Sequence, residues 1–108
     1  MMDRLKDALN EAGFPFVLYA WDTENGTPKK DHGVISLDEG ADFDADDTHA
    51  ERGTLGFCDY FTKSTSKNIR NGIEDVLKAE CDSWSLSSVQ FENDTGFIHY
   101  EWRIGWYG

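Results

Sequence analysis

Basic residues, prolines and cysteines are scarce in this sequence, and long apolar runs are absent. Ten Lys and Arg stand against 21 Asp and Glu among 108 residues, a formal net charge of -11. This balance disfavours direct binding to nucleic acid, because Lys and Arg that neutralise phosphates supply most of that affinity. It disfavours an anionic membrane surface for the same reason. No apolar segment approaches the ~20 residues of a membrane-spanning helix, and residues 1–13 are too charged for a signal peptide.

The shortage of cysteine and the scattered glycines exclude several kinds of site. Cys58 and Cys81 form neither a disulfide framework nor a Cys-x-x-Cys metal pair. We expect both to be buried, reduced thiols. Neither cysteine has a histidine nearby in the sequence, so nucleophilic catalysis has no support. There is also no glycine-rich loop for phosphates. The sequence therefore predicts no enzyme, no cofactor and no metal centre.

The elements follow from hydrophobic periodicity. Apolar residues recur at helical spacing in 2–12 and 67–81, and strand patterns fall in 16–21, 33–38, 51–62 and both arms of a hairpin in 84–107. A change of face between Leu86 and Val89 predicts a β-bulge in the first arm. In the third strand we expect Asp59 to point inward with Leu55, Phe57 and Phe61.

The last strand alternates with period two, which is typical of a half-buried antiparallel strand. One side carries five apolar residues, and we expect the helices to cover it: Ile98, Tyr100, Trp102, Ile104 and Trp106. The other side carries Phe97, His99, Glu101 and Arg103.

Together these patterns predict one α+β domain over residues 1–108, with the element order α-β-β-β-α-β-β. It has two layers, a mainly antiparallel sheet of about five strands and two helices packed on one face.

One segment is strongly acidic. Residues 38–47 hold six carboxylates and no basic residue, so we expect a loop. Asp42, Asp44 and Asp46 have the spacing of the first three ligands of an EF-hand. The pattern then fails, because Asp47 and Gly53 stand where the turn glycine and the bidentate glutamate are needed. A solvated loop or a protein-docking loop that includes Asp42, Asp44, Asp46 and Asp47 is the favoured interpretation over a weak divalent-ion site.

His99 and Glu101 lie on one face of a strand, where an imidazole and a carboxylate can serve acid–base chemistry or metal binding. The spacing suggests no third ligand, and a polar cross-strand pair is the favoured interpretation. Together with Arg103 these side chains form a second candidate surface for a partner.

The overall pattern resembles tail-terminator proteins of long-tailed bacteriophages and prophages, the tail-completion and head–tail joining group. Five stretches carry the resemblance over nearly the full chain. They are a first helix ending at Gly13 and Pro15, the strand at 16–21, the acidic loop at 40–46, the run 49–62 and the closing hairpin 88–102.

This resemblance implies a structural protein of the virion, assembled in the bacterial cytoplasm. Proteins of this kind form a six-membered ring on the tail tube, stop its polymerisation and face the head–tail connector. DNA passes through the ring without specific binding, and no cofactor is held. On this basis Lys substitutions at Asp42, Asp44, Asp46 and Asp47 are expected to abolish tail completion and leave the monomer folded. The alternative is an acidic regulatory or inhibitory protein that mimics DNA and binds a basic protein partner.

Overall fold

The computed structural model describes residues 2–19, 29–38 and 53–107. It contains two helices, α1 (Met2–Glu11) and α2 (Lys67–Glu80), among these residues. The strands there are β1 (Phe16–Leu18), β2 (His32–Leu37), β3 (Thr54–Thr62), β4 (Ser83–Phe91) and β5 (Ile98–Trp106). The element order α-β-β-β-α-β-β is the predicted one. None of the described helices has the length and apolar character needed to span a membrane.

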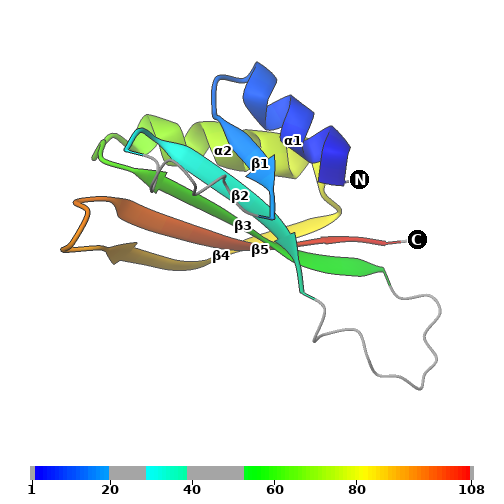
Figure 1. The fold of residues 1–108 in the computed structure, drawn as a ribbon. Coiled ribbons are helices and arrows are strands. Elements are labelled where there is room, and N and C mark those ends of the chain that lie inside the picture. The colour runs from blue at the N-terminus through cyan, green and yellow to red at the C-terminus, as the bar shows by residue number, and fades with distance from the viewer. Residues whose placement is uncertain (1, 20–28, 39–52, 108) are drawn as a thin grey trace.

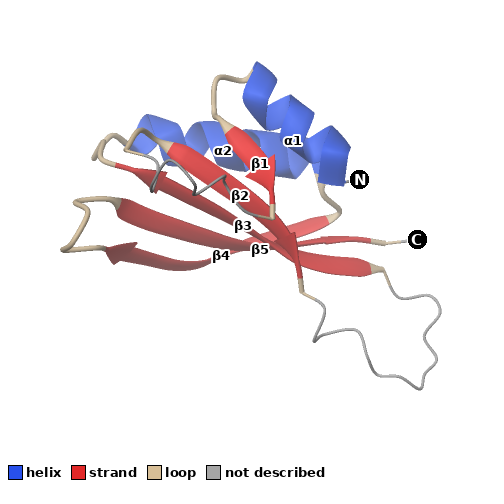
Figure 2. Cartoon of the chain, viewed as in Figure 1, coloured by secondary structure: helices blue, strands red, loops and turns tan. Residues whose placement is uncertain are grey.

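The strands form one sheet with the order β1-β2-β3-β5-β4. Strand β1 pairs with β2 in parallel, and the other three pairings are antiparallel. Both helices lie on the same side of the sheet (Figures 1 and 2). The prediction of a two-layer α+β domain with a mainly antiparallel sheet is therefore confirmed.

The core lies between the helices and one face of the sheet. The helices contribute Leu5, Leu9, Ile73 and Leu77, all fully buried. On the sheet side, Cys58 pairs with Trp102 and Tyr60 with Tyr100, and their side chains meet the helices. The strict alternation of β5 places its apolar side in this layer, as predicted.

The ends of α1 and α2 are fixed by local hydrogen bonds. At the end of α1, the Asn10 side chain donates to the Phe16 carbonyl (3.0 Å) and accepts from its N–H (3.2 Å). Asn10 thus binds β1 as a neighbouring strand would. At the start of α2, the Ser66 hydroxyl accepts from Asn68 N–H (3.1 Å), an N-cap. Each helix is therefore anchored at one end by a short polar side chain.

Several details refine the predicted elements. The register shift between Leu86 and Ser88 confirms the bulge in β4. Strand β1 ends at Leu18, because Tyr19 has a φ of 73° and leaves the extended conformation. Residues 20 and 21 of the predicted strand 16–21 lie outside the described residues. The inward orientation of Asp59 is wrong. Cys58 and Tyr60 occupy the buried side of β3, so Asp59 lies on the opposite face by alternation.

Candidate interaction surface

The face of the sheet opposite the helices, called the open face below, is the candidate functional surface. Its side chains come from three adjacent strands and from the residue before β5. The register sets Phe61 beside His99, Asp59 beside Glu101 and Phe57 beside Arg103. On the other side of β3, His32 of β2 is opposite Phe61. Residues far apart in the sequence thus come together on one face of aromatic rings and charges, in which the His32 side chain is itself buried.

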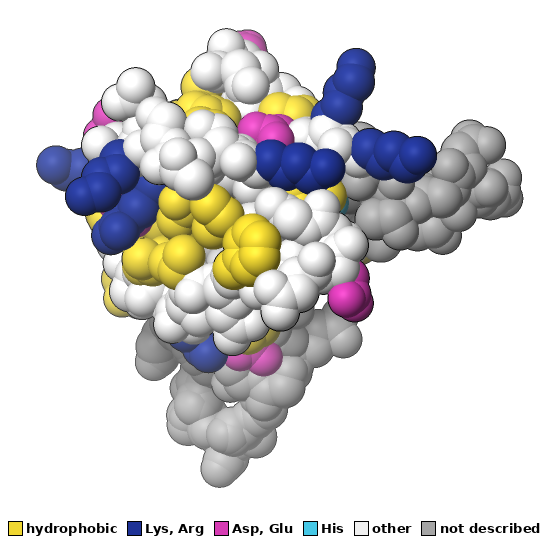
Figure 3. Space-filling model, turned by 90° about the vertical axis from the view of Figure 1, so that its left-hand side faces the viewer, with side chains coloured by type: hydrophobic (Ala, Val, Ile, Leu, Met, Phe, Trp, Pro, Cys, Tyr) yellow, Lys and Arg dark blue, Asp and Glu magenta, His cyan; other side chains and the backbone are white. Residues whose placement is uncertain are grey.

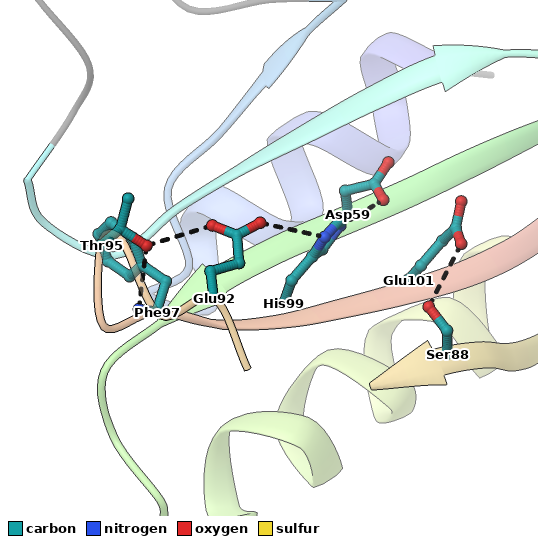
Figure 4. A network of polar contacts seen from close by, with 7 residues as sticks. All are labelled: Asp59, Ser88, Glu92, Thr95, Phe97, His99 and Glu101. Atoms are coloured by element: carbon teal, nitrogen blue, oxygen red, sulfur yellow. Dashed lines mark hydrogen bonds and ion pairs between the residues drawn. The ribbon is translucent and has the colours of Figure 1, made fainter. Parts of the chain in front are cut away.

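His99 is the centre of a polar network on this face (Figure 4). Its Nε2 lies 2.8 Å from Asp59 Oδ1, and its Nδ1 lies 3.7 Å from Glu92 Oε2. Both ring nitrogens therefore face a carboxylate, which favours the doubly protonated imidazolium. The pKa of His99 is raised above 6.5, chiefly by the hydrogen bond to Asp59, while partial burial opposes the rise.

The turn between β4 and β5 holds Glu92 in place. Thr95 Oγ1 donates to Glu92 Oε1 (3.2 Å) and accepts from the Phe97 N–H (3.2 Å). The Glu92 N–H donates to the Phe97 carbonyl (2.8 Å), which closes the turn. The second carboxylate of the His99 network is therefore positioned by the hairpin itself.

A row of three stacked rings crosses the strands beside this network. The Phe61 ring lies 4.2 Å from the His99 ring and 4.8 Å from the His32 ring, nearly parallel to both. Phe97 meets His32 edge-on at 5.2 Å, and Lys63 Nζ lies 5.1 Å from the Phe97 ring centroid. The row gives the open face a rigid aromatic strip, since each ring is held by its neighbour.

Arg103 and Glu101 continue the face toward the other end of the strands. Arg103 Nη2 lies 3.1 Å from Asp38 Oδ2, and its guanidinium lies 5.0 Å from the Phe57 ring centroid. Ser88 Oγ donates to Glu101 Oε1 at 3.4 Å. About half of the Arg103 side chain remains exposed. It is accessible to a partner while it is still held in position.

The structure thus brings His99, Glu101 and Arg103 onto one face, as predicted. The other predicted partner-binding residues, Asp42, Asp44, Asp46 and Asp47, lie outside the described residues. Sequence reasoning missed the roles of Asp59, Glu92 and His32. The outward orientation of Asp59 could have been predicted from the sequence. Side chains alternate along a strand, so if Cys58 is buried, its neighbour Asp59 must point to the opposite face.

The described residues give little basis for covalent or metal chemistry. Burial raises the pKa of the Cys58 thiol well above its ordinary value, and burial with nearby Glu80 and Asp82 raises the pKa of Cys81 to about 12. Both sulfurs are therefore thiols at neutral pH and weak nucleophiles. Within 2–19, 29–38 and 53–107, no group of three His, Cys, Asp or Glu has the geometry to hold a metal ion.

The sequence matches no protein-family model and none of the curated proteins with which it was compared.

Proposed function

We propose that this protein is a structural subunit of a phage or prophage virion, similar to the tail terminators that cap the tail tube as a ring and join it to the head. One observation carries the proposal: the open face is a preorganised surface that the helices do not cover (Figure 1). Aromatic residues and arginine, both present on this face, are enriched at protein–protein interfaces. The surface therefore supports binding of a protein partner better than it supports chemistry on a small molecule.

The way the face is built favours a rigid docking surface. The rings of His32, Phe61 and His99 hold one another, and Asp59 and Glu92 hold the His99 imidazole. Ordering side chains on binding costs about 0.5–1.5 kcal/mol for each flexible residue. That cost is small where the rotamers are already fixed. A subunit that must join a tube or a connector in one orientation benefits from such preorganisation.

The sheet edges limit how subunits can pair through their backbones. Strand β3 cannot pair with another subunit through its backbone, because it lies between β2 and β5 and has both sides occupied. The edge strands of the sheet are β1 and β4. Pairing between subunits through main-chain hydrogen bonds is therefore proposed for these two strands alone.

The experiment is complementation of tail assembly with an open-face variant. Glu101→Lys combined with Arg103→Glu exchanges two charges on the open face and leaves the net charge unchanged. We expect loss of infectious particles with normal circular dichroism. The matched control is Asp75→Lys combined with Lys78→Glu, which makes the same exchange at exposed positions of α2.

The control pair is expected to assemble as the parent protein does. Normal particle yield from the open-face pair would contradict the proposal. Tight binding of the purified protein to a DNA-binding protein, with no effect of either pair on tails, would favour the DNA-mimic alternative instead.

A further inference from the structure

One end of the described molecule is basic although the chain as a whole is acidic. Its cations lie before β2, after β3 and in the first turn of α2: Lys29, Lys30, Lys63, Lys67 and Arg70. These elements meet there because His32 pairs with Phe61, and Thr62 pairs with Ile98. Figure 3 shows Lys and Arg side chains gathered around a hydrophobic patch on the face that it draws. We call this region the basic end.

The hydrophobic patch includes the end of β4. Val89 and Phe91 lie on the helix side of that strand but are 49% and 63% exposed. Phe91 pairs with Ile98, which pairs in turn with Thr62, next to Lys63. Exposed apolar residues beside cations form a surface suited to a partner with negative charge and some apolar character.

The lysines at this end are not neutralised within the described structure. Among residues 2–19, 29–38 and 53–107, no carboxylate lies within ion-pair distance of Lys63 or Lys67. The nearby acids have other partners: Asp31 accepts from Thr62 (2.7 Å), Glu74 binds Arg70 (2.9 Å) and Glu92 faces His99. Asp94, in the hairpin turn, is the exposed acid of this region.

The acidic segment 38–47 begins at the opposite end of the sheet, with Asp38. It follows Leu37, which pairs with Gly56 near the start of β3, and Asp38 N–H donates to the Leu55 carbonyl (2.9 Å). Lys63 follows Leu55 by eight residues, about 27 Å at ~3.4 Å per residue. Asp38, where the segment begins, therefore lies far from Lys63 of the same chain.

We propose that the basic end binds the acidic segment 38–47 of a second copy of this chain. The segment offers six carboxylates, Phe43 and two alanines, which match the lysines and the exposed apolar residues in chemical type. Two different surfaces meet in this contact, so the association is head-to-tail and closes into a ring when the rotation between subunits allows it. The inference extends the proposed function by supplying the contact between ring subunits.

The test uses purified protein and no phage component. In sedimentation at low ionic strength, the parent chain is expected to form oligomers that dissociate in ~0.5 M salt. Two variants should each associate at least about tenfold more weakly, because each replaces two attractive charges with two repulsive ones. They are Lys63→Glu with Lys67→Glu, and Asp42→Lys with Asp44→Lys. An equimolar mixture of the two should recover oligomers, since the introduced lysines of one variant can then face the introduced glutamates of the other.

The matched control compares two single substitutions, Lys67→Glu and Lys78→Glu. Both change an exposed lysine of α2 to glutamate and so make the same change of charge. Lys78→Glu is expected to leave association unchanged. Parent protein that is monomeric at all concentrations, or variants that fail to complement each other, would overturn the inference. Either result would leave the proposed role at the tail open, because tail complementation is measured separately.

Discussion

At the scale of single residues, His99 links the pH of the solution to the stability of the fold. Its pKa is raised above 6.5, chiefly because Asp59 accepts a hydrogen bond from the imidazolium. A group whose pKa is higher in the folded state binds its proton more tightly there. Its contribution to stability is therefore complete below about pH 6.5 and is lost as the pH rises through the folded-state pKa.

His99→Gln is therefore expected to flatten the pH dependence of stability. The free energy of unfolding of the parent protein should fall more steeply than that of the variant as the pH rises above about 6.5. Urea unfolding at a series of pH values measures this difference. Asp59→Asn removes the largest cause of the shift and should flatten the profile as well. Equal slopes for the parent and both variants would contradict the assignment.

Trp102 shows how one buried donor ties the two layers together. The indole is fully buried, and its Nε1 donates to Glu74 Oε2 (2.9 Å), the oxygen that also binds Arg70 Nε (2.9 Å). Glu74→Ala leaves the indole N–H without this acceptor and is expected to lower the free energy of unfolding by about 1–3 kcal/mol. Asp75→Ala, at the next and exposed position of α2, should change it by less than about 0.5 kcal/mol. Chemical denaturation with tryptophan fluorescence measures both, and equal effects would contradict the role of Glu74.

At the scale of elements, the packing of β1 on β2 depends on a missing side chain. Phe16 is buried, stacks on Tyr60 at a centroid distance of 5.3 Å and lies over Gly33. A methyl group at Gly33 would lie 2.5 Å from Phe16 Cζ, which is well inside van der Waals contact. The edge strand can pair in register because glycine leaves room for this ring.

Gly33→Ala is accordingly expected to destabilise the protein by about 1–3 kcal/mol, as measured by urea unfolding. In a Phe16→Leu background the same substitution should cost much less, because the ring that it meets is gone. Strictly additive effects of the two substitutions would show that they do not interact through this contact.

The elements themselves were largely predictable, whereas their pairing was not. Period-two alternation identified β5 and its buried side, and the change of face in β4 identified the bulge. These signals are local. The parallel pairing of β1 with β2 and the central place of β3 depend on contacts between distant segments, which no single stretch of sequence records. Asp59 was misplaced for this reason: Leu55, Phe57 and Phe61 are as apolar as the core side of β3, yet they lie on the open face.

At the scale of the whole molecule, charge is distributed unevenly along the chain. Eight of the 21 acidic residues, but one of the ten basic residues, fall in segments 20–28 and 39–52. The described body is therefore far less acidic than the chain. This difference explains how a chain with a net charge of -11 can still present a basic end. It also provides the complementary charges needed for head-to-tail association.

Two surfaces result from this organisation, and the proposals give them different partners. The basic end is assigned to the next subunit, and the open face to the tube or the connector. The candidate residues on β5 were accessible to sequence reasoning because they alternate with apolar neighbours. The five cations of the basic end are also visible in the sequence, but they lie in three separate segments, and only the sheet shows that they share one end of the molecule.

Electron microscopy of the purified protein mixed with phage tail tubes tests the central proposal most directly. The proposal predicts six-membered rings at one end of the tubes, which disappear with the open-face pair Glu101→Lys and Arg103→Glu and remain with the α2 control pair. Tube ends that stay bare at saturating protein, or rings that are indifferent to the open-face pair, would contradict it.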